Sequence, residues 1–76
     1  MNINKDVFEV KWEQIRAQSL RWWILVGDED LIEVEKAPIR LDKYAMMLRV
    51  KYGYTHERAR QEISRRLAEL ELEEAE

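Results

Sequence analysis

The side chains that could support nucleophilic catalysis are few and widely spaced along this 76-residue chain. His56 is the only histidine, the chain has no cysteine, and the first serine after His56 is Ser64. If both lie on one helix, eight residues separate them by about 12 Å along its axis, which is outside hydrogen-bonding reach. The sequence therefore predicts a protein that is not an enzyme, with a solvated His56 and no catalytic residue.

A second group of side chains is acidic and could in principle hold a hard cation; its members are Asp28, Glu29, Asp30 and Glu33. A calcium loop needs oxygen ligands at alternating positions followed by a distant bidentate glutamate, and this segment lacks that spacing. The same residues are typical of a helix N-terminus, where negative charge stabilises the helix dipole. We therefore predict neither a metal site nor a cofactor.

A third group is basic and could contact nucleic-acid phosphates; it consists of Arg49, Lys51, Arg58, Arg60, Arg65 and Arg66. Nearby tyrosines would offer stacking surfaces for bases. Against this, the net charge is −3, and glutamates interrupt the basic run. Glu62 precedes Arg66 by four residues and Glu69 follows Arg65 by four, the spacing of ordinary surface pairs. Nucleic-acid association is therefore kept as the alternative function.

Helices must position these residues, because composition and periodicity both favour an all-α fold. Two glycines and one proline are too few turn-formers for a hairpin-rich β fold. Apolar residues recur at the helical spacing in four segments, which run from about Asp6 to Leu25, from Asp28 to Pro38, from Leu41 to Lys51 and from Thr55 onward. We expect one domain over residues 1–76, folded as a small bundle of about four helices with long first and last helices.

Local signals mark the ends of these helices. Asn4 and Thr55 can cap the N-termini of the first and last helices. Gly27 and Gly53 can end the first and third in the left-handed conformation that other residues resist. Five glutamates in residues 69–76 oppose the helix dipole, so we expect fraying over about residues 71–76.

The first helix carries two apolar faces. The first should pack into a core made of Trp12, Ile15, Trp23, Leu48, Tyr52, Ile63 and Leu67. On the second, Val10, Ala17 and Ile24 recur every seven residues, with Leu20 beside them and Trp22 at the margin. One helix of a small bundle needs a single buried stripe of about 100°. Either the bundle wraps this helix on both sides, or the second face is an interaction site; we predict a self-association surface and a homo-oligomer.

Several short motifs stand in a recurring order: Asn4-Lys5-Asp6, Trp12 with Gln14, Trp23, Asp28-Glu29-Asp30-Leu31, Glu35, and Tyr52-Gly53-Tyr54-Thr55 with Ala59. This order resembles the CsbD-like family of small bacterial general stress-response proteins, over about Asn4 to Leu67. The chain departs from the family pattern at Ala17 and Lys36, where glycine is usual, and in extra residues from Pro38 to Leu41. The resemblance implies a bundle of about four helices, accumulation under stress and no catalytic activity.

The location of the protein is inferred from apolar segments. The longest uninterrupted apolar run, Trp22 to Val26, is far shorter than the roughly 20 residues that span a membrane. Met1 to Val10 carries charges and no small-residue cleavage site, so we expect no signal peptide. Without cysteines nothing favours an oxidising compartment. We expect a cytoplasmic protein.

Overall fold

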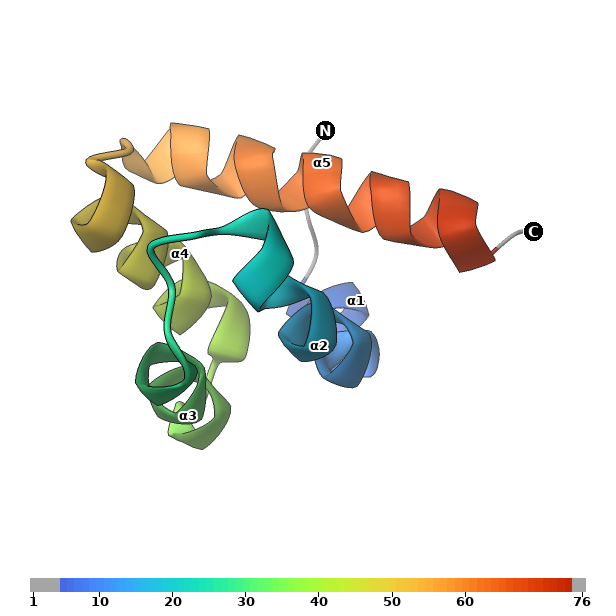
Figure 1. The fold of residues 1–76 in the computed structure, drawn as a ribbon, viewed down its shortest axis with the longest axis horizontal. Coiled ribbons are helices and arrows are strands. Elements are labelled where there is room, and N and C mark those ends of the chain that lie inside the picture. The colour runs from blue at the N-terminus through green and yellow to red at the C-terminus, as the bar shows by residue number, and fades with distance from the viewer. Residues whose placement is uncertain (1–4, 75–76) are drawn as a thin grey trace.

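Five helices account for most of residues 5–74, the part of the chain that the computed structural model describes (Figure 1). They are α1 (Lys5–Val10), α2 (Trp12–Trp22), α3 (Asp28–Lys36), α4 (Arg40–Tyr52) and α5 (His56–Glu74). No strand is present in the described residues, so the predicted all-α fold is confirmed. The predicted second, third and fourth helices correspond to α3, α4 and α5, and the predicted first helix corresponds to α1 and α2 together.

The centre of the fold is α4, because α1, α3 and α5 all pack against it. In Figure 1 the long α5 runs along one edge of the molecule and the other four helices lie on one side of it. α4 is buried over a wide sector, and the residues that it contributes to the core are Leu41, Tyr44, Ala45, Met47 and Leu48. The narrow seam of α5 that meets the core consists of Ala59, Ile63, Leu67 and Leu70.

The predicted core is confirmed at six of its seven positions, because Trp12, Ile15, Trp23, Leu48, Ile63 and Leu67 are all buried. The exception is Tyr52, which is half-buried and packs against the core from its edge. Its hydroxyl accepts a hydrogen bond of 3.0 Å from the backbone N–H of Leu25 in the surface turn after α2. Tyr52 was predicted to be largely buried, and it is only half-buried because its hydroxyl bonds the backbone of this surface turn.

The first helix is shorter than predicted and is divided at Lys11. Lys11 has φ −93° and ψ 4°, which interrupts the helical geometry between α1 and α2. α2 then ends at Trp22 because Trp23 is extended, with φ −131° and ψ 94°. This backbone places the Trp23 ring in the core, with its centroid 5.7 Å from that of Tyr52. Tertiary packing of the ring thus ends the helix before the predicted Leu25.

The two glycines adopt different conformations. Gly53 has φ 71° and ends α4 in the left-handed region, as predicted. Thr55 then caps α5, since its hydroxyl accepts a hydrogen bond of 3.0 Å from the N–H of Arg58. The same prediction for Gly27 was wrong: Gly27 is extended, with φ −109° and ψ 172°, and stands at the N-cap of α3. Because α2 ends earlier, Gly27 begins the next helix instead of ending the previous one.

The remaining predictions of helix ends concern the end of α3, the start of α1 and the end of α5. α3 ends at Lys36, and Ala37 is extended before Pro38, as expected for a residue that precedes proline. The proposed cap Asn4 lies outside the described residues. α5 extends to Glu74, so the helix includes part of the acidic end at about residues 71–76.

Candidate interaction surface

The side of α2 that points away from the core carries two of the five predicted self-association residues, Ala17 and Leu20. Trp12, Ile15 and Ser19 of α2 are buried. At about 100° per residue, Ala17 lies opposite that buried side, and it is exposed. The bundle therefore covers α2 on one side only.

Four apolar residues, Val10, Ala17, Leu20 and Ile24, are exposed here, and we call them the outer face. Val10 is 81% exposed, Leu20 45% and Ile24 89%. None of these side chains is buried by the other helices of the described chain, so the bundle does not wrap this second face of the helix. Trp22, predicted at the margin, is half-buried and packs against the core.

The seven-residue repeat predicted for Val10, Ala17 and Ile24 does not lie on one continuous helix. Ile24 lies in the turn after α2, because the helix ends at Trp22. It therefore lies beyond the end of the helix, and its direction does not follow the helical period. Val10 belongs to α1, on the other side of the interruption at Lys11.

Two open depressions border the outer face. One lies between α2 and α3, and its lining includes Glu13, Arg16, Leu20 and Asp28. The other includes Glu9, Val10, Glu13, Gln14 and Arg40. Glu13 and Glu35 line both depressions. The surroundings of the outer face are thus charged, with carboxylates and guanidinium groups of both signs.

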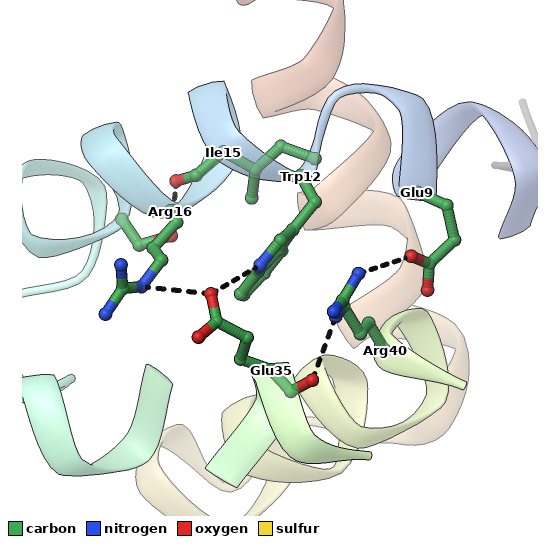
Figure 2. A network of polar contacts seen from close by, with 7 residues as sticks. Glu9, Trp12, Ile15, Arg16, Glu35 and Arg40 are labelled. Atoms are coloured by element: carbon green, nitrogen blue, oxygen red, sulfur yellow. Dashed lines mark hydrogen bonds and ion pairs between the residues drawn. The ribbon is translucent and has the colours of Figure 1, made fainter. Parts of the chain in front are cut away.

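Glu35 is the centre of a polar network between these depressions (Figure 2). Its carboxylate oxygen Oε1 accepts a hydrogen bond of 3.3 Å from the indole N–H of Trp12. The same oxygen lies 3.7 Å from Nε of Arg16. Glu35 therefore ties the end of α3 to the polar edge of the Trp12 ring on α2.

Arg40 extends the network to α1 and α4 (Figure 2). Its Nε donates to the backbone carbonyl of Glu35 at 3.1 Å, and Nη1 pairs with the carboxylate of Glu9 at 2.8 Å. The guanidinium also lies 5.7 Å from the centroid of the Trp12 ring, within the range of a cation–π contact. Four helices are joined by these contacts, which fix how α2 presents its outer face.

A buried pair of hydroxyls was not predicted from the sequence. Ser19 Oγ donates to the carbonyl of Ile15 at 2.6 Å and lies 2.7 Å from the hydroxyl of Tyr44. Because the single hydroxyl proton of Ser19 is used on Ile15, Tyr44 is the donor to Ser19. Burial raises the pKa of Tyr44 to about 12. Both side chains are sealed in the core, so the pair joins α2 to α4 and is not accessible to a substrate.

The residues considered for catalysis and metal binding are dispersed. His56 is exposed at the first position of α5, and Ser64 is half-buried further along the same helix. Asp30 accepts a hydrogen bond of 2.9 Å from the N–H of Gly27 and lies 3.2 Å from Nζ of Lys51. The Gly27 bond, followed by Lys51, lowers the pKa of Asp30. Across residues 5–74 no three acidic or histidine side chains converge as metal ligands.

Most of the basic residues of the nucleic-acid alternative are paired with carboxylates. The pairs are Lys51–Asp30, Arg58–Glu62, Arg60–Asp42, Arg65–Glu62 and Arg66–Glu69, at 2.7 to 3.7 Å. Arg49 is the one member without such a pair in the described part of the chain. The predicted pairs Glu62–Arg66 and Arg65–Glu69 were wrong in their partners, because Arg65 pairs with Glu62 and Arg66 pairs with Glu69. The Arg66 guanidinium also lies over the Trp23 ring, 5.4 Å from its centroid.

No protein-family model matches the chain, and neither a curated protein nor a solved structure resembles it at a significant level. None of the helices within residues 5–74 combines the length and apolar character that crossing a bilayer requires.

Proposed function

We propose that this chain is a non-enzymatic helical protein that acts by protein–protein contact through its outer face, chiefly by self-association. The observation that carries the proposal is the exposure of the apolar residues Val10, Ala17, Leu20 and Ile24 on and beside α2. Removing such side chains from water is favourable by about 25 cal/mol for each Å² of apolar surface. A contact with another protein would supply this stabilisation, which the bundle itself leaves unused.

A second copy of the chain is the simplest partner for this surface. In a two-fold dimer both subunits use the same patch, so one interface buries the exposed side chains of both copies. Charged residues of both signs border the outer face, which suits a surface that must complement itself. The proposal therefore commits to a homo-oligomer.

The biological setting follows from the sequence pattern alone. The resemblance to CsbD-like proteins supports a small stress-associated bacterial protein in the cytoplasm. In that setting self-association would be the molecular property on which the stress role depends. The measurement of that property does not require the stress signal to be identified.

The nucleic-acid alternative is less well supported by the geometry. Five of its six basic residues already contact carboxylates, so phosphate binding would have to compete with these pairs. Phosphate contacts also weaken steeply with salt. A salt-dependent mobility shift on DNA or RNA at low micromolar protein would favour the alternative.

The decisive experiment is the mass of the protein in solution, followed by light scattering or sedimentation from low to high micromolar concentration. Leu20→Glu and Ile24→Glu should shift the protein to monomer with unchanged helical circular dichroism, because an unpaired carboxylate is costly to bury in an interface. Val50→Glu is the matched control, since Val50 is 79% exposed on α4, outside the outer face. A wild-type protein that is monomeric at high micromolar concentration would falsify the proposal.

A further inference from the structure

Two opposite charges are placed symmetrically about Ala17 on α2. Glu13 precedes Ala17 by four residues and Arg21 follows it by four, so both lie within about 40° of its direction at 100° per residue. All three residues are exposed. This outward strip of α2 therefore has a small residue at its centre and one charge of each sign at its ends.

Neither charge is neutralised by an ion pair within residues 5–74. Glu13 forms no ion pair there, and Arg21 makes a hydrogen bond of 3.1 Å to the side chain of Gln18. The two cannot meet within one chain, because eight residues separate them by about 12 Å along the helix. They differ in this from the basic residues of α4 and α5, most of which have carboxylate partners.

We infer that two copies of the chain associate through their α2 helices in an antiparallel arrangement, related by a two-fold axis beside Ala17. This inference rests on the proposed self-association and specifies its geometry. Positions equally far from Ala17 in opposite directions then face each other. Glu13 of each copy comes opposite Arg21 of the second copy, which forms two ion pairs.

The small side chain of Ala17 makes this arrangement possible. Helix axes approach to about 8 Å where the residues at the contact are small. At that separation Glu13 and Arg21 of the second copy are within reach across the helices. The opposed helix dipoles also attract in an antiparallel pair. A parallel pair would instead bring Glu13 onto Glu13 and Arg21 onto Arg21, and both contacts are repulsive.

Charge reversal tests this register. Glu13→Arg or Arg21→Glu alone replaces two attractions with two repulsions, and each should weaken self-association roughly tenfold. The double variant Glu13→Arg/Arg21→Glu restores both pairs in the antiparallel dimer and should recover wild-type affinity. Sedimentation equilibrium of the four full-length proteins gives the dissociation constants, and circular dichroism reports whether each remains folded.

Disulfide trapping provides a second test in a chain with no native cysteine. Ala17→Cys should form a covalent dimer rapidly on mild oxidation, because the two-fold axis places the thiol beside its own copy. Arg49→Cys, exposed on α4, is the control and should remain largely monomeric.

The two proposals fail in different ways. If the single charge reversals associate like wild type while Leu20→Glu is monomeric, the antiparallel register is overturned and self-association through the outer face stands. A double variant as weak as the single variants also overturns the register. If wild type is monomeric, the proposed function itself fails.

Discussion

α2 and α4 lie against each other through the Ser19–Tyr44 hydrogen bond, but their surroundings differ. α4 is packed by α1, α3 and α5, and its strongly exposed apolar residues, Met46 and Val50, stand one turn apart. α2 is buried along Trp12, Ile15 and Ser19, and the opposite side is open. A surrounded helix mainly supports the fold, whereas a helix packed on one side retains a surface for a partner. Substitutions in the two helices should therefore separate effects on stability from effects on association.

The largest loss of stability is expected on the inward side of α2. Trp12 packs against Phe8 and Tyr44, with ring centroids 5.7 and 6.2 Å apart, and also contacts Glu35. Trp12→Ala should cost roughly 3–5 kcal/mol, as large aromatic truncations in cores do. That is enough to unfold a domain of this size. Loss of the cooperative thermal transition by circular dichroism is the expected result, and a melt close to wild type would mean that this face is not essential.

The next effect is expected at Tyr44 in α4 and depends on pH. The folded pKa of about 12 lies above the ordinary 10.0, so the fold favours the neutral phenol. This stabilisation is complete below pH 10 and is lost as the pH rises through 12, a change of about 2–3 kcal/mol. Denaturant unfolding of wild type and Tyr44→Phe across this range should show the difference between them changing with pH. A constant difference would contradict the buried, neutral state of Tyr44.

The two glycines give a smaller, matched pair of effects. Gly53→Ala should destabilise by about 1 kcal/mol, because Gly53 at the end of α4 has φ 71°. Gly27→Ala, in the connection after α2, should change stability by less than about 0.5 kcal/mol. Its backbone is extended, and an added Cβ would lie 3.9 Å from Asp30, an ordinary contact. Chemical denaturation of both variants measures the difference, and equal losses would contradict it.

The smallest effect on stability is expected on the outward side of α2. Leu20→Ala should change the free energy of unfolding by less than about 0.5 kcal/mol at dilutions where the protein is monomeric, because Leu20 is 45% exposed. Its effect on association at higher concentration should be much larger. A loss comparable to that of Trp12→Ala would show that the outer face belongs to the core.

Periodicity and local chemistry were sufficient to predict much of this fold. The stripe through Trp12 and Ile15 and the seam through Ile63 and Leu67 follow the 3.6-residue repeat, and all four are buried. The turn at Gly53 and Thr55 depends on glycine conformation and a side-chain cap, which are properties of neighbouring residues. These features depend little on the rest of the molecule.

Features that depend on distant residues could not be predicted in the same way. The end of α2 at Trp22 follows from the packing of Trp23 near Tyr52, which is distant along the chain. Because α2 ends early, Gly27 stands at the N-cap of α3 and does not end the preceding helix as predicted. No pattern in neighbouring residues predicts contacts between helices that are separated in the sequence. Examples are the Ser19–Tyr44 hydrogen bond and the contacts of Glu35 with Trp12 and Arg16. For the outer face, the pattern identified the exposed residues, and their partner remains a prediction.

The central position of α4 has a consequence for the rate at which the chain folds. Two of its neighbours, α3 and α5, are also its neighbours along the chain, whereas α1 and α2 contact it from further away in the sequence. Short loops between contacting segments reduce the entropy lost before those contacts form, and proteins rich in local contacts fold in microseconds to milliseconds. We expect α3, α4 and α5 to assemble first and α1 and α2 to close the core afterwards. Stopped-flow tryptophan fluorescence should therefore show refolding largely complete within a few milliseconds.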